Sequence, residues 1–301
     1  GQGYGMLLAL VADDRATFDR VWRFARDELQ RPDGLFSWRW DPRSTPHVTD
    51  RNNATDGDIL IATALGLAAE RWRIPEYRIQ AQRIAKAIGR NLIVYHDGHF
   101  VLMPGLEGFG KPYHAISAEG RAVLEIRESP IVNLSYWIYF AFPVLERLAP
   151  DQPWSRVFAD GVGLTLGAGE HLSDWSIVSD HCGICPAPRQ PKEFGYNAIR
   201  IPLYMAMAGM RVSFFFETLL DVWGEPGRGR ISTHLAPGLT PARPMNEPGY
   251  RFIHQYVWCL ERNDPIDFAL FDFRPTTYYA SSLHLLAFTA VYAFNPECVP
   301  H

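Results

Sequence analysis

Helical segments that are apolar on almost every face alternate with segments that are apolar on one face only, and this alternation restricts the fold more than any other feature. Residues 59–72 are apolar all round except at Thr63, Glu70 and Arg71, as expected of a helix inside the protein. Around residues 17–29, apolar residues recur at helical spacing between charged ones, which is typical of a helix with one solvated face. The pattern therefore predicts an all-α fold with inner and outer helices.

The alternation continues along the chain. Apolar segments begin near residues 3, 56, 134, 196, 249 and 278. Each is usually followed by a segment with one polar, solvated face. Six inner and six outer helices would close a double ring, an (α/α)6 barrel whose first outer helix lies upstream of Gly1. A right-angled helical bundle stays open as the alternative. We expect loops around residues 36–40, a short hairpin around residues 99–103, a continuous helix over 134–148 and another over about 196–210.

Composition excludes several classes of function. The net charge of -4 is spread without long runs of like charge, which argues against a nucleic-acid partner. No apolar run approaches the roughly 20 residues that a membrane span needs. The first six residues carry no charged leader, so we expect no signal peptide within residues 1–301. The aromatic share of 13% supplies flat ring faces, which either pack in the core or bind sugars.

The four cysteines allow more than one interpretation. His181, Cys182 and Cys185, together with Cys298 and His301, have ligand spacings compatible with zinc. A Cys-x-x-Cys in a Pro-rich loop is equally compatible with a local disulfide or with two free thiols. We favour a disulfide or free thiols over a zinc site, and we expect neither a metal nor a cofactor.

Two acids, Asp56 and Asp58, flank Gly57 where the apolar segment 59–72 begins. Acidic residues suit a helix start because they face the positive end of the helix dipole. Capping requires only one of them, so a second acid at a buried helix mouth suggests contacts with a ligand. Both interpretations stay open at this point.

Other polar motifs also stand at or just before the starts of apolar segments. In a ring of inner helices these motifs would meet at one face, in a cleft with acids, amides, tyrosine hydroxyls and tryptophan rings that suits a hydroxyl-rich polymer such as a polysaccharide. Arg200, on an otherwise apolar segment, should pair with an acid of that cleft. The motifs are Gly1-Gln2-Gly3-Tyr4, residues 53–58, Asn133 to Tyr136 and Tyr196 to Arg200, with Trp38, Trp40 and Trp175 on nearby loops.

The segment from Ala54 to Trp72 resembles the signature of glycoside hydrolase family 8. Gly1 to Met6, Asn133 to Trp137 and Phe194 to Arg200 resemble further blocks of that family in the same order. The similarity extends over nearly the whole chain and is greatest to the endo-β-1,4-glucanases that accompany bacterial cellulose synthases. It implies a single catalytic domain over residues 1–301 with an (α/α)6 barrel, an inverting mechanism, a β-1,4-glucan substrate and a periplasmic or secreted location.

The resemblance also implies site residues, and two positions depart from the family. The general acid is expected to be a Glu directly before Gly1, outside this chain. The usual base position holds Asn197, and an amide is not a base at ordinary pH. Three explanations compete: a base from another loop, with Asp174, Asp180 or Glu193 as candidates, an inactivating substitution, or a glycan binder that has lost catalysis.

The remaining roles follow from the same resemblance. Asp56 would hold the sugar beside the scissile bond, and Tyr136 would position the water or the Asn197 amide. The predicted substrate-binding residues are Trp38, Asp58, Asn133, Trp175, Tyr196, Arg200, Gln2 and Tyr4. A chitosanase or xylanase of the same family, and a polysaccharide lyase with a helical ring, are the alternatives that the same cleft would serve.

Overall fold

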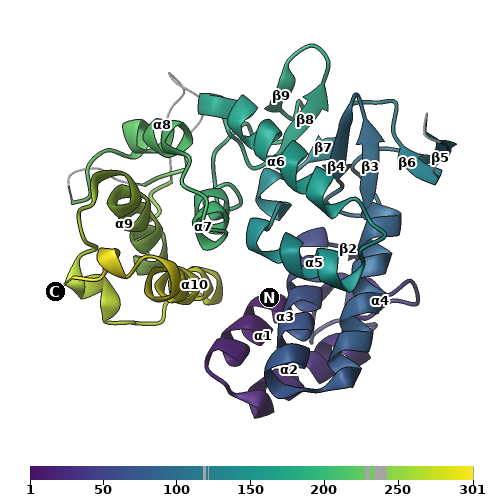
Figure 1. The fold of residues 1–301 in the computed structure, drawn as a ribbon, viewed down its shortest axis with the longest axis horizontal. Coiled ribbons are helices and arrows are strands. Elements are labelled where there is room, and N and C mark those ends of the chain that lie inside the picture. The colour runs from purple at the N-terminus through teal and green to yellow at the C-terminus, as the bar shows by residue number, and fades with distance from the viewer. Residues whose placement is uncertain (118–119, 121, 228–230, 234–242, 301) are drawn as a thin grey trace. The chain divides into compact units, whose positions relative to one another are not determined.

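The chain, seen as a computed structural model, is described at every residue except 118–119, 121, 228–230, 234–242 and 301. It divides into two compact units (Figure 1). The first comprises Gly1–Gly163 with Ile177–Cys182, and the second comprises Leu164–Ser176 with Gly183–His301. Helices supply most of the regular structure in both units, which confirms the predicted all-α class. The single catalytic domain over residues 1–301 stays a prediction.

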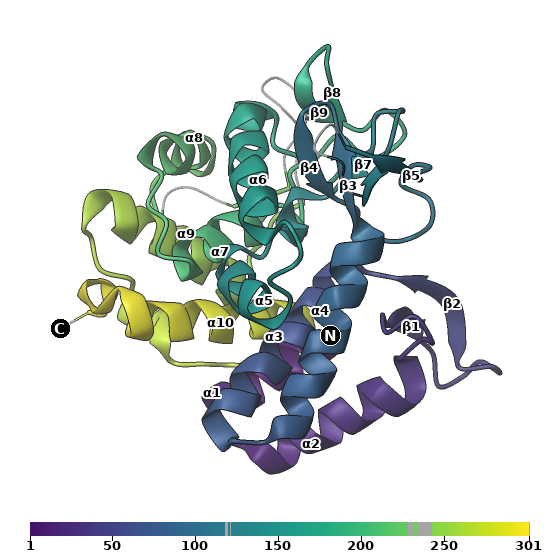
Figure 2. The same cartoon turned by 45° about the vertical axis from the view of Figure 1, so that its right-hand side comes forward.

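The first unit is built on long helices that follow the predicted alternation. The buried helix α3 lies beside the half-solvated helix α4 (Figure 2). The predicted helix over residues 17–29 is present as α2, which continues without a break into a short π-helix. The bounds are α1 Gln2–Val11, α2 Arg15–Phe24, η1 Ala25–Leu29, α3 Thr55–Trp72, α4 Pro75–Leu92, α5 Phe142–Leu148 and α6 Trp154–Ala168, the last of which runs past Gly163.

Helices α1 and α3 approach one another closely at Gly3. A Cβ atom added to Gly3 would lie 2.4 Å from the Cβ of Leu60, which is well inside van der Waals contact. Leu60 itself is buried. The glycine of the Gly1-Gln2-Gly3-Tyr4 motif is therefore required by packing, and it sets the position of the start of α1 against α3.

Short strands interrupt the helices of the first unit. Residues 36–40, which we expected to be a loop, include a strand that pairs antiparallel with a later one. A four-stranded sheet has the order β4-β3-β6-β5, antiparallel except between β3 and β6. The predicted hairpin near residues 99–103 is confirmed as part of this sheet. The strands of the first unit are β1 Ser37–Trp40, β2 Val48–Asn53, β3 Ile93–His96, β4 His99–Leu102, β5 Tyr113–Ile116, β6 Ala122–Glu125, β7 Ile131–Val132 and, except for Ser176, β8 Ser176–Ser179. Strand β9 Gly183–Pro186 belongs to the second unit.

The continuous helix that we expected over residues 134–148 is wrong. The structure has two 3-10 turns, η2 Leu134–Tyr136 and η3 Tyr139–Ala141, before α5 begins at Phe142. Pro143 explains the break in part, because a proline has no backbone N–H with which to continue a helix from the preceding residues. The apolar pattern reported burial correctly, since Trp137, Tyr139 and Phe142 are all buried, but not helix continuity.

The second unit contains the later helices. The helix expected from residue 196 begins only at Arg200 and ends at Met207, where Gly209 takes a left-handed conformation with φ of +71°. The bounds are η4 Gly169–His171, α7 Arg200–Met207, α8 Ser213–Trp223, α9 Pro248–Arg262, η5 Phe268–Phe271, α10 Tyr278–Phe294 and η6 Pro296–Cys298.

We predict that Gly3→Ala lowers the free energy of unfolding by about 1 to 3 kcal/mol, because the added methyl group must push α1 away from α3. Urea denaturation followed by circular dichroism measures the change. Gly163→Ala in α6 is the matched control, since nothing lies within 4 Å of its added Cβ, and it should leave stability unchanged or raise it by up to ~1 kcal/mol. Equal effects of the two substitutions would contradict the packing argument.

Candidate active site

The start of α3 is fixed by backbone contacts with the segment that follows β4. The Thr55 N–H donates to the Pro104 carbonyl at 3.0 Å, and the Thr55 hydroxyl donates to the Met103 carbonyl at 2.6 Å. These bonds orient the first turn, which carries Asp56 and Asp58. The predicted pair of acids is therefore held at a rigid helix start.

Asp56 is half-buried at this helix start. Its Oδ1 accepts a hydrogen bond from the Gly57 N–H at 2.8 Å, a contact that holds the carboxylate close to its own backbone. A side chain that is fixed and still partly exposed can accept hydrogen bonds from a ligand. The geometry is compatible with the predicted sugar-holding role.

Asp58 has a different role from the one we predicted. Its exposed fraction is 0%, Oδ1 accepts from the Phe36 N–H at 2.9 Å, and Oδ2 accepts from the Asn53 Nδ2 at 2.7 Å. Burial raises the pKa of Asp58 to about 8, although these two hydrogen bonds act in the opposite direction. A carboxyl group with no surface cannot contact a substrate, so Asp58 joins the start of α3 to the segments around Phe36 and Asn53.

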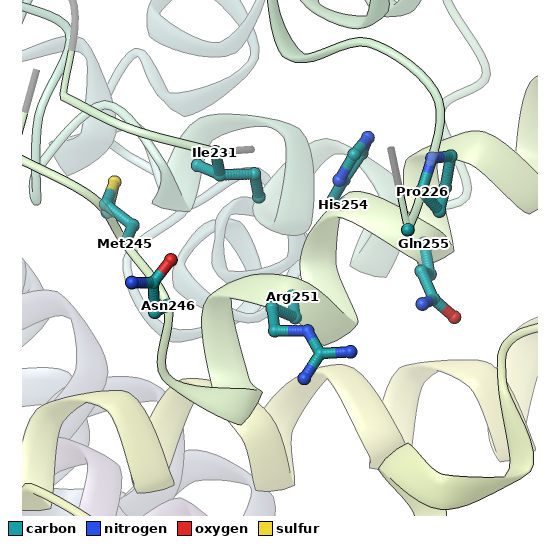
Figure 3. A pocket seen from close by; sticks show the side chains of 8 residues that line it. Pro226, Ile231, Met245, Asn246, Arg251, His254 and Gln255 are labelled. Atoms are coloured by element: carbon teal, nitrogen blue, oxygen red, sulfur yellow. The ribbon is translucent and has the colours of Figure 1, made fainter. Parts of the chain in front are cut away.

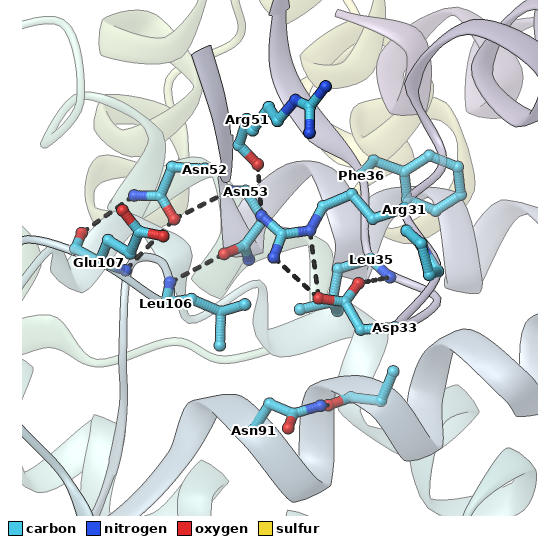
Figure 4. A network of polar contacts seen from close by, with 12 residues as sticks. Arg31, Asp33, Leu35, Phe36, Arg51, Asn52, Asn53, Asn91, Leu106 and Glu107 are labelled. Carbon is cyan, nitrogen blue, oxygen red and sulfur yellow. Dashed lines mark hydrogen bonds and ion pairs between the residues drawn. The ribbon is translucent and has the colours of Figure 1, made fainter.

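Two asparagines directly before the helix extend this structural network (Figure 4). Asn53 Oδ1 accepts from the Leu106 N–H at 2.8 Å. The amide of Asn52 donates to the Glu107 carbonyl at 2.9 Å and accepts from the Glu107 N–H at 3.2 Å. Asn53 belongs to the motif 53–58 that we expected to line the cleft, whereas Asn52 was not predicted as a site residue. Asparagines beside a helix start are typical of turns fixed by side chains.

Trp38 presents a large ring to solvent from β1. Its exposed fraction is 55%, and its indole hydrogen-bonds to the carboxylate of Asp50, which lowers the pKa of that acid. The neighbouring Trp40 is instead packed, with its ring 5.3 Å from Phe24 and 4.9 Å from His47. Of these two tryptophans, Trp38 is the more exposed, as stacking on a sugar requires. The Arg39 guanidinium lies over its ring at 5.9 Å from the centroid.

Asn133 forms the cap of the turn η2 and is almost fully buried, with an exposed fraction of 1%. Its Oδ1 accepts from the Ser135 N–H at 3.1 Å and from the Ser135 hydroxyl at 2.7 Å. Its Oδ1 therefore has a structural role, and the substrate contact that we predicted for Asn133 stays a prediction. Tyr136, in the same turn, is half-buried, so part of its surface stays accessible.

The first helix contributes less exposed surface than expected. Tyr4 is buried, with an exposed fraction of 5%, and Gln2 is half-buried. The ring of Tyr4 therefore packs in the core. Sugar contacts by Gln2 and Tyr4 stay predictions.

In the second unit, one carboxylate organises the segment that contains the usual base position. Asp174 Oδ1 accepts three backbone hydrogen bonds, from Gly195 at 2.8 Å, Asn197 at 3.2 Å and Ala198 at 2.8 Å. Its Oδ2 faces the Asn197 Nδ2 at 3.3 Å. Burial raises the pKa of Asp174, while the three N–H donors and the nearby charge of Arg200 oppose the shift.

The amide of Asn197 has a defined orientation. Arg200 Nη2 donates to Asn197 Oδ1 at 2.8 Å, and Asn197 Nδ2 points to Asp174. The oxygen thus faces a cation and the nitrogen faces an acid, which is the favourable arrangement of an amide between opposite charges. The Arg200 guanidinium reaches the amide oxygen of Asn197, and its charge acts on Asp174. The direct pairing of Arg200 with an acid stays a prediction.

Aromatic residues lie beside this cluster. Tyr196 has an exposed fraction of 37%, and its ring centroid lies 5.7 Å from that of Tyr250. The Tyr279 hydroxyl donates to the Tyr196 carbonyl. Trp175, next to Asp174, is half-buried. Tyr250 and Tyr279 were not predicted, because nothing in their local sequence distinguishes them from packing residues.

The three acids proposed as alternative bases differ in their surroundings. Asp174 contacts Asn197 directly. Glu193 has a side chain that is 24% exposed and forms an ion pair with Arg243 at 3.5 Å. Asp180 is exposed on the turn after β8 and belongs to the first unit. Of the three, only Asp174 has a described contact with the amide at the base position.

All four cysteines are in disulfide bonds. Cys259 is joined to Cys298, and Cys182 and Cys185 are also in disulfide form. Thiolates are needed to bind zinc, so the zinc interpretation of these cysteines is wrong. Among the residues that the structure describes, no cluster of three His, Cys, Asp or Glu side chains could hold a metal ion.

A cavity of about 290 Å³ in the second unit was not predicted from the sequence (Figure 3). Arg251 and Gln255 extend into this region from α9, and His254 lies on the same helix. The His254 ring nitrogen Nε2 lies 2.8 Å from the Gly224 carbonyl, and burial lowers the pKa of this histidine. Its lining is completed by Pro226, Gly227, Ile231, Met245 and Asn246.

No helix in the part of the chain that the structure describes is long and apolar enough to cross a membrane.

Comparison with known proteins identifies similar sequences and structures. A family model described as glycosyl hydrolases family 8 matches residues 1–214. A probable endoglucanase of Novacetimonas hansenii is 33% identical over 297 residues, which cover 96% of this chain and 81% of that protein. An endoglucanase of Cellulomonas uda is 33% identical over 211 residues, 68% of this chain and 55% of that protein.

Among solved structures, the endo-beta-1,4-glucanase CMCax from Acetobacter xylinum is similar over 98% of this chain and 89% of its own. Its TM-score is 0.81 and its sequence identity is 32%. Similarity of this extent shows that the two chains share a fold.

Asp58 should make stability depend on pH in a defined window. Its pKa is about 8 in the folded chain and about 3.8 as an ordinary carboxyl, so the folded state binds the extra proton between these values. The contribution of Asp58 to the free energy of unfolding is therefore greatest below pH 4. It decreases as pH rises towards 8, by up to about 1.4 kcal/mol per pH unit. We predict that the stability of wild type relative to Asp58→Asn falls over pH 4 to 8, measured by urea denaturation.

The exposed acid Asp50 is the control for this experiment. Its pKa is lowered, so the difference between wild type and Asp50→Asn should change only below about pH 4. A flat difference between pH 4 and 8 for Asp58→Asn would contradict the assignment.

Proposed function

This chain belongs to glycosyl hydrolase family 8, and we propose that it cleaves internal β-1,4-glucosidic bonds of a cellulose-like glucan by an inverting acid/base mechanism. It is a glycoside hydrolase with endoglucanase relatives, and it has the fold of a solved endo-beta-1,4-glucanase. The observation that carries the proposal is the family match over residues 1–214, which contain both acids at the start of α3 and the Asp174, Asn197 and Arg200 cluster. The (α/α)6 barrel implied by the resemblance agrees with the helical fold.

Inverting hydrolysis needs an acid that protonates the leaving oxygen and a separate carboxylate that activates water. We assign the second role to Asp174. Its Oδ1 is occupied by three backbone donors, whereas Oδ2 has only the Asn197 amide as a described partner. The raised pKa of Asp174 favours proton uptake, because a stronger base takes a proton from water more readily.

Asn197 would then be a positioning residue in this chain. Its oxygen is held by Arg200 and one of its N–H groups by Asp174. An amide carries two N–H donors, so the second one is available to orient the attacking water. This arrangement favours a natural Asn197 with a neighbouring base over an inactivating substitution or a lost function.

The substrate contacts that we propose rest on exposure. Asp56 is half-buried and would hold the sugar next to the scissile bond. Tyr136, also half-buried, would position the attacking water. Trp38, Trp175 and Tyr196 would stack against or border glucosyl rings, since none of these residues is buried. Gln2 completes the set as a hydrogen-bonding side chain at the start of α1.

We further propose that the protein works in the periplasm or outside the cell, on glucan linked to bacterial cellulose synthesis. The disulfides support an oxidising compartment, where such bonds persist. The link to cellulose synthesis rests on the resemblance to the endoglucanases that accompany cellulose synthases.

The function is tested by product analysis. We propose that the proton donor is a Glu directly before Gly1, so a chain that includes it should release oligosaccharides of inverted anomeric configuration from carboxymethylcellulose. Residues 1–301 alone should bind cello-oligosaccharides and cleave at least ~10² times more slowly, because general acid catalysis contributes this much. Reducing-sugar assays and proton NMR measure rate and configuration.

The alternatives give different products. Unsaturated ends that absorb in the ultraviolet would indicate a lyase. Binding of the oligosaccharide by the longer chain without cleavage would support a glycan binder. Faster cleavage of chitosan or xylan than of glucan would reassign the substrate within the family.

The base assignment is tested separately, in the chain that includes the upstream acid. We predict that Asp174→Asn lowers kcat by about 10² to 10⁴ with little change in KM, because it removes proton transfer and leaves sugar contacts in place. Glu193→Gln is the matched control and should retain most of the activity. Thermal denaturation verifies that both variants fold.

Asn197→Asp distinguishes this assignment from a lost base. A carboxylate at this position would face Asp174 Oδ2 across about the 3.3 Å that now separates it from the amide. Two carboxylates so close do not both ionise readily, so their joint titration should move to higher pH. We expect the acidic limb of the pH–rate profile to shift upward without a large gain in rate. A gain of ~10² or more would mean that Asn197 replaces the true base.

A further inference from the structure

Phe268 is the most exposed large apolar side chain among the described residues, with an exposed fraction of 75%. It opens the short turn η5 between α9 and α10. A single exposed apolar residue is common on protein surfaces and needs no explanation by itself. What distinguishes Phe268 is that it stands on a fixed turn and borders a cavity.

The turn is fixed at both ends. Asp267 Oδ1 accepts from the Ala269 N–H at 2.9 Å, and the Asp267 N–H donates to Gln255 Oε1 at 2.6 Å. Leu270 is buried, and its carbonyl lies 2.8 Å from the Nε2 of His284. With Leu270 directed inward, the ring of Phe268 is held outward on a rigid support, which reduces the entropy that binding would cost.

Phe271, which is half-buried, packs the same turn against neighbouring helices. Its ring centroid lies 5.3 Å from that of Phe252 and 5.5 Å from that of Phe288. The turn therefore uses one aromatic residue for packing and exposes the other, so exposure of Phe268 does not arise from a loosely attached loop.

The cavity beside Phe268 has a volume of about 480 Å³ and combines apolar and hydrogen-bonding groups. Arg274 donates to Asp272 at 2.8 Å in an exposed ion pair. Arg251 of α9 lines the same cavity. The other lining residues are Pro248, Ala269 and Leu270.

This mixture fits a neutral sugar better than other ligands. A pyranose ring has an apolar face of C–H groups and a rim of hydroxyls, which match an aromatic ring beside guanidinium donors and a carboxylate acceptor. The Asp272 carboxylate pairs with Arg274, so only one of the two guanidinium charges is left to attract an anion. A purely apolar ligand would leave three charged groups without water. The volume accommodates a short segment of glycan and not a whole polymer.

We propose that Phe268 and the cavity beside it form an auxiliary binding site for a β-glucan chain, separate in its residues from the Asp174, Asn197 and Arg200 cluster. The proposal rests on the proposed function for its choice of sugar. An enzyme that cleaves internal bonds acts on a long polymer. A polymer that is held at a second site on the protein is present at a higher effective concentration at the first.

The test compares Phe268→Ala with Phe214→Ala in otherwise identical full-length protein. Phe214 on α8 is 73% exposed and does not line this cavity, so it controls for general loss of surface apolarity. Depletion binding to insoluble cellulose measures attachment to the polymer, and calorimetry with cellotetraose measures oligosaccharide binding.

We expect Phe268→Ala to weaken binding to cellulose about fivefold to tenfold, because stacking covers roughly one face of the ring. Phe214→Ala should bind like wild type, and Phe268→Trp should bind at least as well as wild type. Arg251→Gln should weaken binding by a smaller factor. Asn197→Ala should lose cellotetraose binding at the candidate active site and keep most of the attachment to cellulose.

Each other outcome overturns the proposal. Unchanged cellulose binding by Phe268→Ala, in a wild type that binds cellotetraose, contradicts the auxiliary site and leaves the proposed function intact. Equal losses for Phe268→Ala and Phe214→Ala would indicate non-specific apolar adsorption. A changed molecular mass by light scattering would identify the surface as an interface between two copies. Wild type that binds neither cellotetraose nor cellulose contradicts the proposed function as well as the site.

Discussion

The three backbone hydrogen bonds to Asp174 Oδ1 are the interaction on which the candidate active site depends. They bring the N–H groups of Gly195, Asn197 and Ala198 to one oxygen and thereby determine the path of the chain immediately before α7. The side chains of Tyr196, Asn197 and Arg200 take their directions from that path. Gly195 is needed at this turn, because a Cβ there would lie 2.7 Å from Asp174 Oδ2. One buried acid thus positions the whole segment while its second oxygen stays beside Asn197.

A similar arrangement holds the start of α3 in the first unit. Asp58 is the buried acid there, and it accepts from a backbone N–H and from the amide of Asn53. In both units a buried acid accepts hydrogen bonds from a backbone N–H more than 20 residues away in the sequence and from an asparagine side chain. Neutral donors can be shared in this way because a carboxylate has about four lone-pair sites. A nearby side chain, Asp56 in one unit and Asn197 in the other, is also held in place by hydrogen bonds.

The identity of residue 197 changes the electrostatics of its cluster. With a neutral amide between Asp174 and Arg200, the cluster contains one negative and one positive side chain, so its charges cancel. A carboxylate there would add a second negative charge next to a buried one, and one of the two would have to take up a proton. The neutral side chain at this position is therefore consistent with the proposal that Asp174 is the group of this cluster that takes up a proton.

The sequence by itself determined the helical class, the alternation of buried and half-solvated helices, and the family. Those features are local, since a 3.6-residue period and a contiguous signature can both be counted along the chain. The sequence did not determine the break at residues 134–148 or the strand at residues 37–40, because apolar content reports burial and not continuity of hydrogen bonding. It also did not separate the roles of the two acids at α3. Asp56 and Asp58 are two positions apart, so they point about 200° apart around the helix, and only the tertiary packing decided that Asp58 faces the protein and Asp56 the surface. The contact of Asp174 with Asn197 joins residues 23 positions apart, and only the folded chain shows that the acid and the amide meet.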